Sequence, residues 1–286
     1  MAIGVHTNYA SIVAQNTLNA TNNGLTKSME RLATGLRINS AADDAAGLQI
    51  ASRLEMQTRG MSVAQRNSQD AISMMQTAEG ALDEVANIAY RMNDLAIQSA
   101  NGSNGATDRT ALNAEYQELA KEIHSILEGT NFGGNTLLEG GAFAQAGGVS
   151  YQIGTAATDT LTVDLSTELG ALNTAIGTSA GTNFGDITDQ ANSATAQNLL
   201  SAAGGVLEQI GEIRAAFGAN INRLEHTITN LDNMTENLTA SKGRITDVDF
   251  ASESGMLTKN QMLMQSGSQM LSTTKMVPQM ALSLLG

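Results

Sequence analysis

The chain has 286 residues, of which 42% are hydrophobic and only 3% aromatic, with one proline, no cysteine, no tryptophan and 14 methionines. The lack of cysteine excludes disulfides, thiolate zinc sites and thiol catalysis, and the formal net charge of −13 does not suit nucleic acid or an anionic membrane as a partner. Because proline breaks helices and aromatic rings supply much of the packing in compact enzymes, this composition favours long helices packed through aliphatic side chains and methionine.

The N-terminal segment, from about Ile3 to Leu36, is predicted to be a helix with a coiled-coil seam. Leu18, Leu25 and Leu32 recur every seven residues, which is the period of side chains that meet a partner helix.

A break and a second, longer helix follow. Residues 39–44 contain Ser and Asp, which cap free N–H groups and suit the positive end of a helix. The helix predicted from about Ala45 to Ser99 would be roughly 80 Å long at 1.5 Å per residue, too long for the core of one compact domain. A turn at residues 101–105 precedes a third helix that ends at Gly129. The apolar stripe of the second helix consists of Ile72, Met75, Leu82, Val85, Ala89, Met92 and Leu95.

The centre of the chain differs in character. Gly, Ala, Thr, Asn and Ser dominate from Thr130 to about Gly185. Residues 149–153 and 161–165 alternate apolar with polar side chains around a turn-like stretch, which predicts a β-hairpin. No Lys or Arg occurs between Lys121 and Arg214, so this part of the chain is acidic.

Two further helices are predicted after the centre. The first runs from about Gln190 to Thr239 with apolar steps of three and four, and Lys242–Arg244 resembles its stop. Thr246, Asp247 or Asp249 then starts a last helix that continues to the end of the sequence. This last helix has a seam every seven residues, formed by Met256, Leu263, Met270, Val277 and Leu284. Small or polar residues occupy the intervening half-heptad steps, namely Asn260, Gly267, Thr274 and Ala281.

The predicted organisation is mirrored about the centre. Charge-poor helices in residues 1–40 and 246–286 flank longer amphipathic helices in residues 41–129 and 190–245, with residues 130–189 as a short insert. The fold class that follows is mainly α: long antiparallel helices in a coiled-coil bundle, with the terminal helices paired and a small β-hairpin insert in the middle.

Residue patterns typical of catalysis or of cofactor and metal binding are missing. His6, His124 and His226 stand apart, and none lies in a His-Glu-x-x-His zinc motif. Residues 177–181 match the letters of a Gly-x-Ser-x-Gly nucleophile elbow, but Gly, Thr and Ser continue on both sides, which predicts a loop. The methionines near the C-terminus could bind Cu(I), but their place on the seam favours packing. We therefore expect that the protein is not an enzyme and binds neither a cofactor nor a metal ion.

Two membrane-related signals are also missing. The first eight residues, MAIGVHTN, carry neither the basic start nor the apolar core of a Sec signal peptide. Apolar runs stay well short of the ~20 residues of a membrane-spanning helix. We therefore expect no membrane partner, and both the cytosol and export by a route without a Sec signal stay open.

Five segments carry a specific resemblance to a known family. They are GLRINSAADDAAG at 35–47, QTAEGAL at 76–82, LAIQSAN at 95–101, RITDVDFA at 244–251 and VPQMALSLL at 277–285. These segments are similar to motifs of the bacterial flagellins, and the likeness covers about residues 1–138 and 191–286. The centre matches nothing specific, as is typical of that family's variable region.

The resemblance implies a structural subunit that polymerises into the flagellar filament, alone or with other flagellins. The terminal helices would form an inner tube around the export channel, the longer helices a surrounding layer, and the insert would face solvent. The leucine and methionine seams would then be assembly contacts. Subunits of the family leave the cell unfolded through the flagellar type III apparatus. The implied partners are the cap protein, the hook-junction proteins and an export chaperone at the C-terminal helix.

The resemblance also implies an innate-immune receptor contact. Arg91, Leu95 and Glu115 match the positions of the motif through which flagellins meet the flagellin-sensing Toll-like receptor of animals. Asn93 and Asp94 depart from the Arg-Glu pair of strongly stimulating members. The alternative is that Leu95 is only a core residue and Arg91 only a solvated charge.

Three other classes of protein are alternatives to a filament subunit. A flagellar hook–filament junction protein has similar terminal helices. A signalling coiled coil would carry a continuous heptad pattern without the Gly- and Thr-rich insert. An enzyme would need a catalytic constellation that the sequence lacks.

Overall fold

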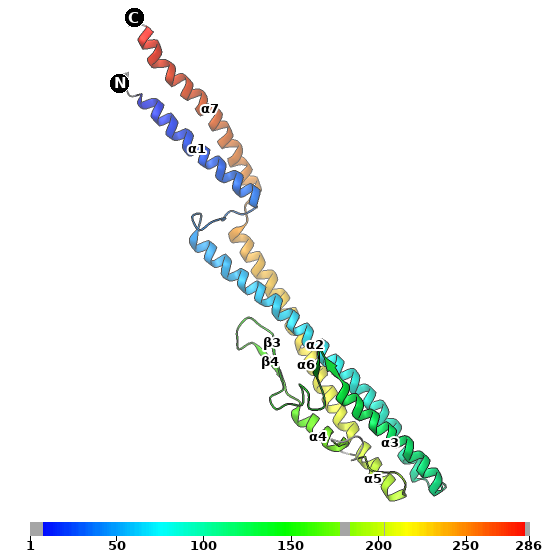
Figure 1. The fold of residues 1–286 in the computed structure, drawn as a ribbon. Coiled ribbons are helices and arrows are strands. Elements are labelled where there is room, and N and C mark those ends of the chain that lie inside the picture. Colours follow the sequence, from blue (N-terminus) through cyan, green and yellow to red (C-terminus); the bar gives the residue numbers. More distant parts are fainter. Residues whose placement is uncertain (1–7, 178–183, 203, 284–286) are drawn as a thin grey trace. The chain divides into compact units, whose positions relative to one another are not determined.

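The computed structural model describes residues 8–177, 184–202 and 204–283, with side chains up to Met276. Its fold is mainly helical, as predicted (Figure 1). The helices are α1 Tyr9–Thr34, α2 Ala45–Ala100, α3 Ala106–Gly129, α4 Ser166–Ile176, α5 Gln190–Ser201, α6 Val206–Thr246 and α7 Phe250–Ser283. The strands are β1 Asn131–Phe132, β2 Asn135–Thr136, β3 Val149–Gln152 and β4 Thr160–Val163.

The chain divides into two compact units. The terminal unit combines Met1–Thr58 with Glu236–Gly286, and the central unit is Arg59–Thr235. The long helices α2 and α6 contribute to both, so each unit joins segments from the two halves of the sequence.

In the terminal unit, α1 and α7 run antiparallel, side by side (Figure 1). The side-chain amide of Asn8 donates to the carbonyl of Thr274 at 2.8 Å, and at the other end of the pair the Arg31 guanidinium lies 3.5 Å from the Glu253 carboxylate. The Glu253 side chain is buried, so this ion pair offsets the cost of removing a carboxylate from water. The predicted pairing of the two terminal helices is therefore confirmed.

Acidic side chains begin the helices where the sequence predicts. The Asp44 carboxylate accepts a hydrogen bond from the backbone N–H of Gly47 at 2.9 Å, at the first turn of α2. The Asp249 carboxylate accepts from the N–H groups of Ala251 and Ser252 and starts α7. These bonds satisfy donors that a helix leaves free at its N-terminus. At the other end of α1, Gly35 takes φ +73°, a left-handed conformation that favours glycine.

The core of the central unit lies between α2, α3 and α6, with the insert packed against them. All seven residues of the predicted α2 stripe are buried. Aromatic rings meet at two places: Phe143 and Phe217 at 5.0 Å between centroids, and Tyr116 and Phe184 at 6.5 Å, both edge-on. Burial raises the pKa of Tyr116, whose hydroxyl donates to the Phe184 carbonyl at 3.2 Å. Four of the chain's nine aromatic residues thus meet where the insert joins the helices.

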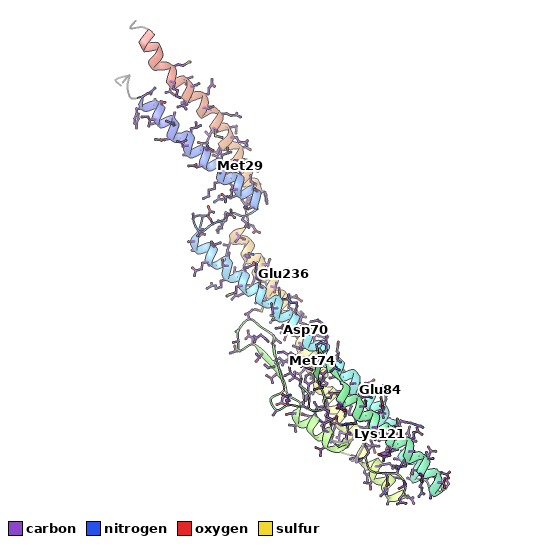
Figure 2. The ribbon with its side chains drawn as sticks, in the orientation of Figure 1. Met29, Asp70, Met74, Glu84, Lys121 and Glu236 are labelled. Carbon is purple, nitrogen blue, oxygen red and sulfur yellow. The ribbon has the colours of Figure 1, made fainter. Side chains whose placement is uncertain are left out.

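The predicted β-hairpin is present as β3 and β4, which pair antiparallel with Val149 opposite Val163 and Tyr151 opposite Leu161. The Tyr151 hydroxyl lies 3.1 Å from the sulfur of Met74, which Figure 2 labels on α2. Burial raises the pKa of Tyr151 to about 12. One face of the hairpin therefore packs on α2. The side chains of β4 alternate between buried and exposed, so the other face points to solvent.

Three details differ from the sequence predictions. The helix predicted over residues 190–239 is two helices, α5 and α6, separated by a turn in which Gly204 has φ +80°. The stretch Lys242–Arg244 does not stop α6, which continues to Thr246, and the Lys242 ammonium pairs with Glu55 on α2. The insert also contains a helix that was not predicted, α4. Of the elbow-like motif at 177–181, residues 178–181 lie outside the described part of the chain.

Candidate assembly surface

The contact between α1 and α7 uses one row of α7. The side chains of α7 that are least exposed follow steps of four and three, and they are Glu253, Leu257, Asn260, Met264, Gly267, Leu271 and Thr274. This row contains the small and polar half-heptad positions noted in the sequence. Steps of four and three keep one face of a helix against its partner, so this row is the coiled-coil seam within a single chain.

The leucines of α1 fit that row closely. Leu25 is buried and Leu18 and Leu32 are half-buried. If Gly267 had a Cβ atom, that atom would lie 3.1 Å from the Cδ1 atom of Leu18. A Cβ atom on Gly24 would likewise lie 3.2 Å from the side-chain amide nitrogen of Asn260. Each helix therefore places a larger side chain where the other has a glycine, as knobs enter holes.

The large row of α7 lies beside this contact and remains open. Met256, Leu263 and Met270 are 51%, 47% and 67% exposed. The side chain of Val277 and all of Leu284 lie outside the described part of the chain. Among the described residues, then, the leucines of the predicted seam on α1 are covered by α7 of the same chain. The seam residues on α7 face solvent.

An apolar groove runs along the same pair of helices. It has a volume of about 580 Å³ and is lined by Val13, Leu18 and Thr21 of α1 and by Leu263, Gly267 and Met270 of α7. Other apolar side chains nearby are also exposed, among them Met29, labelled on α1 in Figure 2. Contiguous exposed apolar surface of this kind marks a protein interaction site.

The turn between α1 and α2 is held by an ion pair. The Lys27 ammonium lies 2.6 Å from the Asp43 carboxylate, which also accepts hydrogen bonds from the backbone N–H groups of Asn39 and Ser40. The pKa of Asp43 lies well below its usual range, mainly because of the bond to Lys27 and secondly because of the two backbone hydrogen bonds. These contacts fix the turn that returns the chain from α1 to α2.

The second predicted site lies in the central unit. The Arg91 guanidinium contacts one Glu115 oxygen through two nitrogens, at 2.7 and 3.1 Å, and both side chains are exposed. Leu95 is only 1% exposed and belongs to the core. The structure therefore brings Arg91 and Glu115 together on the surface and leaves Leu95 out of reach of a partner.

The described ranges also bear on metal binding and on membrane insertion. Clusters of three or more His, Asp or Glu side chains that could hold a metal ion are missing there. No described helix is both long and apolar enough to cross a bilayer. His6 lies outside the described residues, and the Nδ1 atom of His124 lies 3.0 Å from a Glu139 oxygen.

Comparison with known proteins relates this architecture to one family. The model of the bacterial flagellin N-terminal helical region matches residues 5–142, and that of the C-terminal helical region matches residues 200–285. The sequence is 38% identical to flagellin D of Vibrio anguillarum in an alignment of 378 positions that covers 100% of both chains. The chain belongs to the flagellin family. A flagellin of Halalkalibacterium halodurans is 44% identical over 260 positions, 91% of each chain.

Membership of the family decides between the alternatives weighed from the sequence. This flagellin is a non-enzymatic subunit of the flagellar filament. The crystal structure of Bacillus cereus flagellin is 34% identical, with a TM-score of 0.48 over 58% of this chain and 88% of that chain. Residues 143–199 lie outside both family models, and the Vibrio alignment is longer than the 286 residues of this flagellin. The Vibrio relative therefore carries residues that this flagellin lacks.

Proposed function

We propose that the terminal unit joins this flagellin to its neighbours in the filament. In the predicted assembly seam, Leu18, Leu25 and Leu32 hold α1 on α7 within the chain. The contacts with neighbouring subunits are made by the other half of the seam, which is Met256, Leu263, Met270, Val277 and Leu284. The observation that carries this proposal is the exposed row of Met256, Leu263 and Met270 beside an apolar groove. Fully burying one such side chain contributes roughly 1.5–3 kcal/mol, and the contact is repeated in every subunit.

The layers of the polymer are those that the family resemblance implies, and the distribution of charge along the chain agrees with them. Residues 1–40 and 246–286 form the inner tube, residues 41–129 and 190–245 the layer around it, and residues 130–189 the outer surface. Between Glu253 and Gly286 only three charged residues occur, Glu253, Lys259 and Lys275, and charge-poor helices are the ones that can be buried. The acidic insert is best placed in solvent, because burying unpaired carboxylates is costly.

The remaining partners are assigned by family resemblance. The export chaperone covers α7 before secretion, and the type III apparatus exports the chain. The cap protein and the hook-junction proteins meet subunits at the two ends of the filament. The exposed apolar side chains of α7 support the chaperone assignment, because such a surface on a free subunit favours aggregation.

Seeded elongation tests the assembly role. Purified full-length chain is added to short filament seeds and examined by electron microscopy. We expect long helical filaments from the seeded sample, and a mixture without seeds is the control. A chain that binds seed ends without lengthening them would behave as a junction protein and contradict the proposal.

The receptor contact is proposed at the Arg91–Glu115 pair, with Leu95 supporting α2 from beneath. The double variant Arg91→Ala, Glu115→Ala should lower receptor-reporter potency by on the order of tenfold, since arginines are enriched among the interface residues whose loss costs more than 1 kcal/mol. A matched control is Arg214→Ala with Asp83→Ala, which removes an ion pair of 2.9 Å between α6 and α2. Equal potency of wild type and the Arg91 variant would reject the assignment.

A further inference from the structure

The exposed methionines of α7 form a distinct set. Met256, Met262, Met270 and Met276 are 51–67% exposed. Met256 and Met270 are fourteen residues apart, as are Met262 and Met276, so each pair shares a helix face at two heptads' distance. Thioethers are therefore presented on two faces of α7, and Met270 also lines the apolar groove.

The rest of the chain makes these sulfurs prominent targets for oxidation. The sequence has no cysteine and no tryptophan, so an oxidant has no thiol to react with first. Three other methionines, Met61, Met75 and Met92, are buried in the central unit. Because susceptibility follows exposure, the four α7 thioethers should react well before the buried ones, as should the exposed Met29, Met56 and Met234 outside α7.

We propose that these four methionines are a reversible oxidation site that controls whether a free subunit can join the filament. The oxidant is a peroxide. The sulfur lone pair attacks one peroxide oxygen, the O–O bond breaks, and an S–O bond forms. Sulfur loses two electrons and the peroxide is reduced to water. A dithiol-dependent methionine sulfoxide reductase reverses the change.

The effect on assembly follows from polarity and rests on the proposed role of the terminal unit. A sulfoxide is a polar acceptor, and burying it without a hydrogen bond costs free energy that an apolar thioether does not. Subunits already in the filament have this surface covered by neighbours. Oxidation therefore acts on subunits before they are incorporated, and filaments are protected.

The test oxidises full-length monomer with hydrogen peroxide and follows each methionine by peptide mass spectrometry. We expect one added oxygen at each of these four methionines before any appears at Met61, Met75 or Met92. Elongation on unoxidised seeds should fall by on the order of tenfold, as expected for a loss near 1.4 kcal/mol per added subunit. Treatment with methionine sulfoxide reductases should restore it.

Two variants locate the effect. The quadruple variant M256L, M262L, M270L, M276L keeps apolar volume and should elongate equally before and after peroxide. Met56→Leu removes an exposed thioether outside α7, and elongation of this variant should stay sensitive. If the quadruple variant does not elongate seeds even without peroxide, the deciding measurement is whether the reductases restore elongation of oxidised wild type. Restored elongation supports the site. Elongation that is not restored, in a chain whose helicity is unchanged, overturns it.

The outcomes separate the two proposals. Untreated wild type that fails to elongate seeds would contradict the assembly role itself. Untreated wild type that elongates, together with oxidised wild type that elongates equally with four sulfoxides present, would overturn the oxidation site alone. Oxidation of the four methionines in intact filaments at the monomer rate would also overturn it, because neighbours would then not cover them.

Discussion

Leu263→Asp is expected to give a soluble, helical monomer that does not elongate filaments, even on seeds. Leu263 is half-exposed in the single chain and lines the groove between α1 and α7. The monomer tolerates a carboxylate at that exposed position. Burial against a neighbouring subunit would leave the charge unpaired, at a cost of several kcal/mol. Circular dichroism, sedimentation and electron microscopy of the seeded sample measure the three parts of this expectation.

The matched control for this variant is Leu263→Met, which keeps the volume and apolar character of the side chain. It should elongate seeds at close to the wild-type rate. The core of the central unit shares no residue with this site, so both variants should keep the unfolding midpoint of that unit. Normal filaments from Leu263→Asp would mean that the exposed row of α7 is not buried in the polymer.

Phe217→Ala is expected to cost about 3–5 kcal/mol of the free energy of unfolding of the central unit. The Phe217 ring is fully buried on α6 and packs edge-on against Phe143 of the insert at 5.0 Å. Removing it leaves a cavity where the insert meets the long helices. Denaturant unfolding followed by circular dichroism measures the loss.

Ile97→Ala is the control for that measurement, because Ile97 lies on α2 with its side chain exposed. We expect a change within about 0.5 kcal/mol, as for most surface substitutions. Similar losses in the two variants would show that the Phe143–Phe217 contact does not stabilise the central unit.

Much of this fold was predictable because the signals are local. A seven-residue repeat, an apolar step of three and four, and an Asp before a helix act over one or two turns. They located α2 and the caps at Asp44 and Asp249, and they predicted that the two ends of the chain pair. Alternation with a period of two located the β3–β4 hairpin in the same way.

The missed elements had weak or competing local signals. The helix α4 buries Leu169, Leu172 and Ile176 at helical spacing, and the Asp164 carboxylate accepts a hydrogen bond from the Ser166 N–H at its start. That spacing was visible, but it covers only three turns inside a stretch rich in Gly and Thr. The stretch Lys242–Arg244, which resembled a stop, lies inside α6, and its Lys242 pairs with Glu55, nearly two hundred residues away in the sequence.

The sequence by itself determined that this protein is built from paired terminal helices with seams, longer amphipathic helices and a short acidic insert. Only the tertiary structure decided which row of α7 meets α1. Both half-heptad rows have the period of a coiled coil, and the choice depends on shape across the contact, where Leu18 faces Gly267. It likewise decided that Leu95 points into the core while Arg91 and Glu115 meet at the surface, because burial depends on what packs above a helix as well as on its period.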